Sequence, residues 1–528
     1  MRSSDAHQVM WHQIFPEPDR RGTTLQSQLR VCFVDAVLDG RLLAGMRLPS
    51  SRELADMLAI SRNTVVLVYE KLAEDGYLEN RPRNGYYVSD EYLRHVREST
   101  AYSATTSPNH QNQPANDLRH GQAVDWHARM CPLPAMKWLD KPGDWQRYRY
   151  PFLYGQFDPS LFPIADWREC SRQALDVSSI RGWAPDAIDS DNASLVDQLI
   201  KRVLPRRGIA AKREEVLLTV GAQQALYLVS ELLVPPGSTV AVEDPGYMDA
   251  RNIFLRRGAL LQGLGLDRDG VLPDPAVLAS SQTVYCTPSH QCPSGVTLST
   301  ERRLALLAWA REHDGILIED DYDAEMQYAG KPSPALKAID HDRRVIYIGS
   351  LSKTLSPGLR IGYVVAPAEV IVQLRVLRRL MIRHPATNNQ QAAALFISHG
   401  HYDRFLHLMR DELARRAALL IEAVRRHLPE MDFVAPDGGS ALWGSFNGKA
   451  GTEVNAVNAV NTIDTRELRK TAAEHGILFE SGEAFFLSQQ GQFNCIRLGF
   501  SSIPADRIEP GIKELAALLP RRRGLKLA

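Results

Sequence analysis

The sequence predicts an α/β protein in two folded parts, a small helical module followed by a larger domain built on a mostly parallel sheet. Near the N-terminus, stretches of helical periodicity lead into a short, turn-rich pair of strands. From about Tyr148 onward, short β-branched runs alternate with amphipathic stretches. Such alternation is typical of parallel strands that are covered by helices on both faces.

Length and composition fit this division. A chain of 528 residues suits two or three domains, and 44% apolar with 23% charged residues is ordinary for a globular protein. The 62 basic and 62 acidic residues cancel, so nucleic-acid binding must rest on a local patch. The six cysteines show no metal or redox spacing, so we expect free thiols, a reducing cytoplasm and no metal site. We expect no membrane span and no signal peptide, because the apolar runs are too short.

Composition also sets the expected boundaries. We assign residues 23–90 to the small module, 91–146 to a linker and 147–528 to the larger domain. Residues 99–121 are polar, carry Pro and Asn, and are poor in large aliphatic side chains. Such a segment cannot bury enough apolar surface to offset the entropy that ordering costs, which is typical of a linker.

The first helix of the small module is expected over Leu25–Leu38, with an apolar face that includes Leu29 and Phe33. Ser50 and Glu53 form the pattern of a capping box that opens a second helix. Ser61 is placed to cap a third helix that stops near Gly76. Residues 77–79 and 85–88 then read as a β-hairpin, which completes a winged helix-turn-helix.

This geometry places Arg62, Asn63 and Thr64 at the start of a helix that can reach base edges. Arg81 and Arg83 lie at the tip of the hairpin, where they can meet phosphates or the minor groove. Residues 1–90 carry eleven basic and twelve acidic side chains, so binding would need a local patch. The alternative is a small packing module with solvated arginines. The candidate patch consists of Arg47, Arg52, Arg62, Arg81 and Arg83.

The order of these motifs resembles the winged helix-turn-helix of the GntR family of bacterial regulators. The resemblance rests on Leu48-Pro-Ser-Ser-Arg-Glu-Leu-Ala, Ser61-Arg-Asn-Thr-Val, Tyr69-Glu-Lys-Leu and Gly76-Tyr-Leu. It implies a double-stranded DNA operator as partner, with Arg52, Arg62, Asn63 and Thr64 as contacts. The family's wing tip resembles Gly-Ser-Gly-Thr-Tyr, where this chain has Arg83-Asn-Gly-Tyr-Tyr.

A second set of motifs predicts a pyridoxal phosphate site, which needs an amine, an anion for the pyridine nitrogen, a phosphate cup and an aromatic face. Lys353, in Gly-Ser-Leu-Ser-Lys-Thr-Leu-Ser-Pro-Gly-Leu-Arg, supplies the amine for a Schiff base. Ser350, Ser352 and Arg360 flank it and can hold a dianionic phosphate.

The anion is expected from Asp320, just past an apolar run beginning at Ile316, because ligands gather at the carboxyl ends of parallel strands. Asp320 precedes Lys353 by 33 residues, which leaves room for a further strand between them. An aspartate there keeps the ring nitrogen protonated. Tyr322, two residues on, can hydrogen-bond the ring hydroxyl.

The remaining candidate site residues lie after two other strands and in the C-terminal region. Gly221, Ala222 and Gln223 open a helix whose backbone amides would face the phosphate. Tyr247 follows a strand and can stack on the ring. Arg497 can bind a carboxylate of a substrate or effector in bidentate fashion. Taken singly, each motif has an ordinary explanation: a surface lysine, a solvated acidic loop or magnesium site, a helix start that only packs, or a surface salt bridge.

In this order, however, the motifs resemble fold-type I aminotransferases, and their fusion to a GntR-like module resembles the MocR subfamily of regulators. That resemblance implies a smaller C-terminal α+β subdomain and a cytoplasmic homodimer. It also implies that pyridoxal phosphate is held as a lysine imine and that an amino compound, or the cofactor itself, is sensed. By motif it carries over Lys353, Asp320, Tyr322, Tyr247, Arg360 and Arg497.

Two segments depart from the family pattern. Cys292, in Thr287-Pro-Ser-His-Gln-Cys-Pro-Ser-Gly, replaces an aromatic residue, which predicts a wider pocket or a buried core cysteine. Residues 185–198 lack the glycines, tyrosine and arginine of a loop that helps build the neighbouring subunit's active site. We therefore expect a DNA-binding regulator with a sensor domain and no efficient turnover. The alternatives are an active aminotransferase with an appended DNA-binding module, and a constitutive DNA-binding dimer with a cofactor-free domain.

Overall fold

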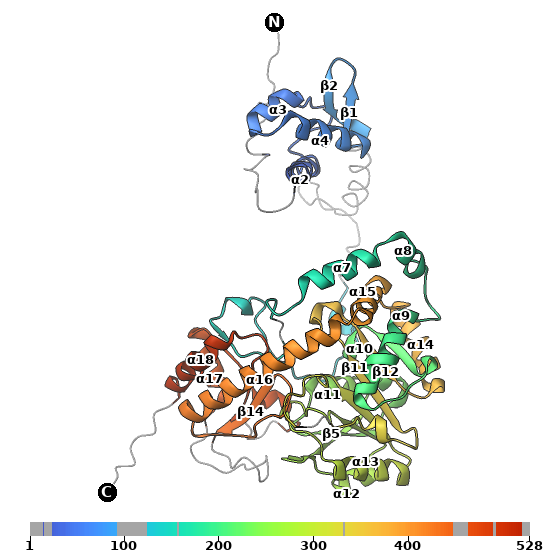
Figure 1. Cartoon of the computed structure of the whole chain (residues 1–528), viewed down its shortest axis with the longest axis vertical. Coiled ribbons are helices and arrows are strands. Elements are labelled where there is room, and N and C mark those ends of the chain that lie inside the picture. Colours follow the sequence, from blue (N-terminus) through green and yellow to red (C-terminus); the bar gives the residue numbers. More distant parts are fainter. Residues whose placement is uncertain are drawn as a thin grey trace, which may run out of the picture. The chain divides into compact units, whose positions relative to one another are not determined.

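The computed structural model describes Ile14 and residues 24–91, 124–155, 158–330, 333–446, 463–488 and 493–519. The chain forms two compact units, Met1–Trp126 and His127–Ala528 (Figure 1). Residues 99–121 of the predicted linker lie outside the described residues.

The smaller unit is a winged helix-turn-helix, as predicted. Its elements are α2 (Leu25–Leu38), α3 (Ser51–Leu58), α4 (Arg62–Glu74) and the antiparallel hairpin β1 (Leu78–Arg81) and β2 (Gly85–Val88). Both predicted caps are confirmed: Ser50 and Glu53 form a capping box, and the Ser61 hydroxyl accepts from the Thr64 amide at 3.1 Å. Tyr69 centres the core, because its ring packs against Phe33 and its hydroxyl donates to the Pro49 carbonyl at 3.0 Å.

The larger unit is built on a seven-stranded sheet of order β4-β12-β11-β10-β9-β5-β6. Every pairing is parallel except those of β12, which is antiparallel to both neighbours. The alternation of β-branched runs with helical stretches predicted from about Tyr148 onward is confirmed. The strands are β4 (Val216–Thr219), β5 (Thr239–Glu243), β6 (Leu260–Leu264), β9 (Thr283–Cys286), β10 (Ile316–Asp321), β11 (Val345–Ser350) and β12 (Gly362–Val365).

Helices cover both faces of this sheet, which explains why its strands are apolar on both sides. On one face, buried side chains of α10 (Gly221–Leu233), α11 (Met248–Arg256) and α14 (Ala368–Ile382) pack on residues such as Leu217 and Ile318. On the other face, α12 (Pro275–Ser280) and α13 (Thr300–Glu312) pack on residues such as Val284 and Leu317.

The C-terminal part is a smaller α+β subdomain. Its antiparallel sheet, of order β13-β14-β17-β16, comprises β13 (Met431–Phe433), β14 (Ala441–Phe446), β16 (Glu480–Ser481) and β17 (Cys495–Gly499). The long helix α16 (His401–His427) runs from α15 (Thr387–Ser398) to this subdomain, where it packs against α18 (Ala505–Ala517) (Figure 1). The remaining helices are α6 (Trp126–Arg129), α7 (Ile164–Ala174), α8 (Val177–Trp183), α9 (Ala193–Gln198) and α17 (Thr465–Glu474), and the remaining strands are β3 (Tyr150–Pro151), β7 (Leu266–Asp267), β8 (Gly270–Val271) and β15 (Ile477–Leu478).

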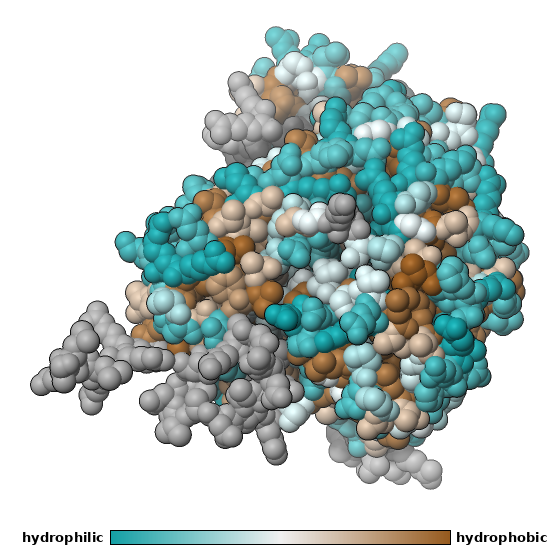
Figure 2. Space-filling view, turned by 60° about the horizontal axis from the view of Figure 1, so that its bottom comes forward, coloured by the Kyte–Doolittle hydropathy of each residue, from teal (hydrophilic) through white to brown (hydrophobic). Residues whose placement is uncertain are grey.

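The surface carries mostly polar side chains, with apolar residues in small groups among them on the face drawn in Figure 2. The helix α14 carries an exposed apolar row: Val372, Val376 and Leu380 are exposed and lie four residues apart, hence on one side of the helix. Among the described residues, no helix is long and apolar enough to cross a membrane.

Candidate functional site

The candidate site is a cavity of about 160 Å³ at the carboxyl ends of the parallel strands of the larger unit. It draws residues from the ends of β10 and β11, from the start of α10, and from the segments that follow β5 and β9. Nine of the eleven residues predicted for the cofactor and effector line it. The lining consists of Tyr154, Ala222, Gln223, Leu226, Tyr247, Cys292, Asp320, Tyr322, Ser350, Ser352, Lys353 and Arg360.

Asp320 is a buried carboxylate with one oxygen unengaged. Its Oδ2 accepts a hydrogen bond from the Tyr285 hydroxyl at 2.8 Å, whereas its Oδ1 has no partner among the described residues. Burial raises the pKa of Asp320 to about 7, against the lowering effect of the Tyr285 bond. A buried oxygen without a partner is costly, so this site is suited to a ligand that carries a donor or a positive charge.

Lys353 lies in the loop that follows β11 and is a half-buried residue of the cavity wall. Its Nζ lies 4.7 Å from the centre of the Tyr154 ring. Burial lowers the pKa of Lys353 to about 8, and the positive charge of Lys141 acts in the same direction. Near neutral pH a much larger fraction of this amine is therefore unprotonated than in an ordinary lysine, which is the state that attacks a carbonyl.

The start of α10 and the side chain of Arg360 form the cationic end of the cavity. Arg360 donates from Nη2 to the Val220 carbonyl at 3.1 Å, which holds its guanidinium at the first turn of α10. Gly221 has a φ of +75°, and a Cβ there would lie 2.6 Å from Nη2 of Arg360. Gly221 itself does not line the cavity; it allows the arginine to approach the free amides of Ala222 and Gln223.

Two tyrosines frame the middle of the cavity. The Tyr247 hydroxyl donates to Gln223 Oε1 at 3.0 Å and lies 3.1 Å from Asp249 Oδ2, which positions its ring. The Tyr322 hydroxyl, predicted to meet a ring hydroxyl, donates to the His290 carbonyl at 2.7 Å. Its oxygen keeps the capacity to accept a further hydrogen bond.

Arg497 lies next to the cavity but is not among the residues that line it. Its guanidinium carbon is 4.2 Å from the centre of the Tyr154 ring, and its Nη1 is 3.5 Å from Cys292 Sγ. The arginine is buried and paired, since its Nε donates to Glu480 Oε2 at 2.5 Å. Burial raises the pKa of Glu480. The charge of Arg497 acts in the opposite direction, and the pKa lies below its usual range.

Several residues of the site escape sequence reasoning. Tyr285 stands in a predicted strand, but nothing in its pattern shows that its hydroxyl meets a carboxylate 35 residues later. Lys141 falls in the predicted linker range, yet its Nζ lies 2.8 Å from Glu480 Oε1 and donates to the Tyr154 carbonyl at 2.9 Å. Tyr154 belongs to the irregular segment after β3. The position of Lys141 and Tyr154 outside regular elements, as a charged and an aromatic residue, is a signal that could have pointed to them; Tyr285 carries no such signal.

Residues 185–198, which depart from the family pattern, do not line the cavity. They dock on α14 through ion pairs, because Asp191 lies 2.6 Å from Arg375 and also pairs with the buried Arg378. In this chain the segment is thus bound to its own larger unit by charge.

In the smaller unit, the predicted DNA contacts lie on α3, α4 and the hairpin. Arg52, Arg62 and Asn63 are exposed, and Thr64 is half-buried with its hydroxyl 2.8 Å from that of Ser61. Arg81 is engaged within the wing, since it pairs with Glu79 at 3.3 Å and lies 4.3 Å from the Tyr87 ring centre. Arg83 is exposed at the tip with a φ of +68°.

Both units match known families. Residues 33–88 match the gntR family of bacterial regulatory proteins, and residues 158–515 match aminotransferase class I and II. The larger unit superposes on Pyrococcus horikoshii kynurenine aminotransferase with a TM-score of 0.64 and 27% identity, over 71% of this chain and 91% of that one. Fold and site together thus define a helix-turn-helix regulator with an aminotransferase-like domain.

Two relatives align with this chain through nearly their whole length. The transcriptional regulator TauR of Rhodobacter capsulatus is 37% identical over 96% of this chain and 98% of its own length. The probable rhizopine catabolism regulatory protein MocR of Rhizobium meliloti is 29% identical over 91% and 90%. The chain belongs to the MocR-type transcriptional regulators of the GntR family, and this membership implies that it binds DNA.

Proposed function

We propose that this regulator binds pyridoxal 5'-phosphate in the cavity of its larger unit and senses an amino compound, or the cofactor itself, through Lys353. One observation carries the proposal: Lys353, Asp320 and the first turn of α10 all line the same cavity. An amine, a buried carboxylate and a cationic helix start are the groups that this cofactor requires.

The cavity fits the cofactor at its two charged ends. The unpartnered Oδ1 of Asp320 suits a protonated pyridine nitrogen, which would relieve the cost of burying that oxygen. Arg360, Ser350, Ser352 and the free amides at the start of α10 would hold the phosphate. When bound, the cofactor supplies an electrophilic aldehyde carbon and an electron-withdrawing ring. Tyr247 would pack on that ring and Tyr322 would bond its hydroxyl.

The effector is proposed to be an amino compound that competes with the Lys353 amine for the aldehyde. Arg497 is the candidate for binding its acidic group, since it lies beside Tyr154 and Cys292, which line the cavity. To do so, Arg497 would share or exchange its bond with Glu480. Because Lys141 is also paired with Glu480, two cations share one carboxylate, and the net positive charge of these three groups favours an acidic effector.

The response is proposed to pass through a homodimer whose linkers hold the two DNA-binding units. An effector can shift such an equilibrium only through different affinities for the two forms. The exposed apolar row of α14 supports a self-association surface. In the smaller unit, Arg52, Arg62, Asn63 and Thr64 are the proposed base and phosphate contacts, with Arg83 at the wing tip.

An absorbance titration with pyridoxal phosphate, followed by candidate amino acids and run beside a DNA-shift assay, tests the proposal. We expect the lysine-bound cofactor to give a visible band that Lys353→Ala loses together with the effector response. The matched control is Lys513→Ala, an exposed lysine of α18 outside the cavity. A Lys353→Ala protein that still answered its effector normally would show that the covalent route is wrong. No spectral change on adding the cofactor to wild-type protein would favour a cofactor-free domain.

Transamination is the second candidate, because the cavity retains both the amine and the carboxylate. Purified protein mixed with the cofactor, an amino acid and a keto acid would then form a new amino acid continuously. We expect at most one exchange per chain, since residues 185–198 lack the motif that aminotransferases contribute to a neighbouring active site.

A further inference from the structure

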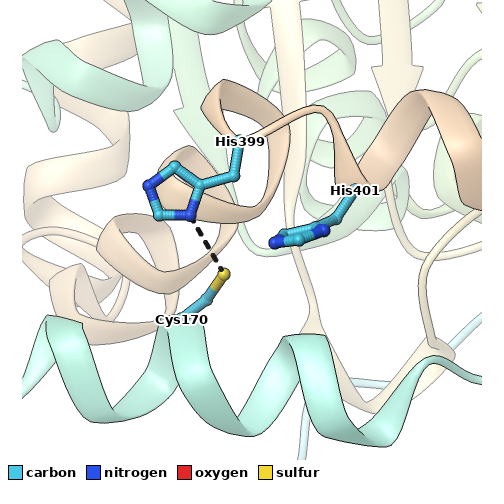
Figure 3. A group of neighbouring side chains, drawn as sticks. All are labelled: Cys170, His399 and His401. Carbon is cyan, nitrogen blue, oxygen red and sulfur yellow. Dashed lines mark hydrogen bonds between the residues drawn. The ribbon is translucent and has the colours of Figure 1, made fainter.

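A cluster of one cysteine and two histidines lies in the larger unit on residues that do not line the cofactor cavity. Cys170 is on α7, His399 caps the C-terminus of α15, and His401 is the first residue of α16 (Figure 3). One ligand atom from each of the three residues lies within 4.8 Å of the other two. The cysteine and His399 are 229 residues apart in the chain, so no sequence spacing reveals them.

We propose that Cys170, His399 and His401 bind a divalent transition-metal ion such as Zn²⁺. A thiolate and two imidazoles are the ligands that zinc prefers, and three protein ligands leave a fourth position for water. In a tetrahedral site, zinc–sulfur and zinc–nitrogen bonds of about 2.3 Å and about 2.0 Å place the two ligand atoms about 3.5 Å apart. Cys170 Sγ and His399 Nδ1 lie 4.0 Å apart, so a small rotation of the His399 ring would bring them to that separation.

The surroundings of the cluster suit a metal site. His399 is exposed, so its ring is free to turn toward an ion, whereas Cys170 is fully buried and fixes the inner side. Asp166 Oδ1 lies 3.8 Å from Nδ1 of His401. This carboxylate, whose Oδ2 pairs with Arg404, would orient the imidazole if it closed to hydrogen-bond distance on metal binding, and would leave the other nitrogen, Nε2, to bind the ion.

Burial, followed by the negative charges of Asp166 and Glu169, raises the pKa of the Cys170 thiol. A bound cation would reverse this and release the proton, as metal binding to a thiol requires. The ion would then tie α7 to the first residue of α16. Because α16 runs on to the C-terminal subdomain, the ion would stabilise the junction between α7 and that helix (Figure 1).

The test uses the full-length reduced protein, prepared without a polyhistidine tag and stripped with a chelator. Equilibrium dialysis against Zn²⁺ with elemental analysis gives the number of ions per chain, and Co²⁺ reports geometry through its visible spectrum. We expect one ion per chain and the intense thiolate-to-cobalt bands of a tetrahedral site. Cys170→Ser should lose those bands, and His399→Ala should bind Co²⁺ at least about tenfold more weakly.

Matched controls are Cys131→Ser and His341→Ala, which change an exposed cysteine and an exposed histidine outside the cluster. Neither should alter stoichiometry or spectrum. Asp166→Asn should weaken binding by about 10- to 100-fold while the tetrahedral bands remain. Because His399 is exposed, its variant should fold even if Cys170→Ser does not. Absence of bound ion in the wild-type protein, or unchanged cobalt bands in His399→Ala, would overturn the proposal.

Discussion

The Tyr285 hydroxyl donates to Asp320 Oδ2 at 2.8 Å, a bond between neighbouring strands β9 and β10. It stabilises the charged carboxylate, against burial that favours the neutral form. Only the charged form can hold a protonated pyridine nitrogen, so this tyrosine should support cofactor binding from outside the cavity lining.

Tyr285→Phe should therefore weaken pyridoxal phosphate binding by about tenfold, the usual effect of losing one hydrogen bond to a charged group. The pKa of Asp320 should rise further, so the loss should grow as the pH falls toward about 7 and level off below it. Tyr347→Phe is the matched control. It removes a 2.9 Å hydrogen bond to Asp321, which follows Asp320 on β10 but does not line the cavity. Equal losses in both variants would contradict a specific role for Tyr285.

The pKa of Lys353, lowered to about 8, predicts how fast the protein captures the aldehyde. The neutral amine is the reactive species, and its fraction rises about tenfold per pH unit below the pKa and levels off above it. Stopped-flow absorbance after mixing cofactor-free protein with pyridoxal phosphate should show this plateau near pH 8. A rate that keeps climbing beyond pH 10 would mean that Lys353 titrates like an exposed lysine.

Lys141 tunes this amine from outside the cavity lining. Its positive charge lowers the pKa of Lys353, so Lys141→Met should move the plateau to higher pH and slow capture at pH 7 several-fold. Lys141→Arg keeps the charge and should retain the wild-type profile. The methionine variant also removes the partner of Glu480 Oε1, which leaves the bond to Arg497 as the remaining ion pair of that carboxylate. If both variants matched the wild-type profile, the charge of Lys141 would have no part in setting the pKa.

The fold and most of the cavity could be predicted from the sequence because strand ends carry recognisable motifs. Asp320, Lys353 and Gly221 each follow a strand or precede a helix, so a parallel sheet brings them to one edge. Strand β12 runs antiparallel to both of its neighbours and has no such motif. Its place in the sheet depends on pairing with β4 and β11. Tyr285, Lys141 and the cluster around Cys170 meet their partners through tertiary packing alone, and local sequence carries no trace of that.

Gly221 offers a direct test of the cationic end of the cavity. A methyl group added at Gly221 would lie 2.6 Å from Nη2 of Arg360. The backbone φ of +75° is also strained for any residue that carries a Cβ. Gly221→Ala should lose about 1–2 kcal/mol of stability from the backbone and, by displacing Arg360, weaken pyridoxal phosphate binding. Gly237→Ala carries the same strain at a φ of +82° but has no atom within 4 Å. It should lose similar stability and bind the cofactor normally; a shared binding loss would point to strain and not to Arg360.

Substitutions at the start of α4 in the smaller unit should have two separable effects on DNA binding. Arg62 is exposed, and its Nε lies 3.4 Å from the Ser51 hydroxyl, so it can reach a phosphate. Arg62→Ala should weaken binding to every sequence alike and reduce the slope of affinity against salt concentration by about one.

Asn63→Ala should cost about 1–3 kcal/mol on the preferred operator and less on others, because a base contact reads sequence. Arg41→Ala, an exposed arginine paired with Asp39 after α2, is the control. Fluorescence anisotropy at several salt concentrations separates the two effects. An Arg62→Ala protein with the salt slope of Arg41→Ala would place the phosphate contact elsewhere on the unit.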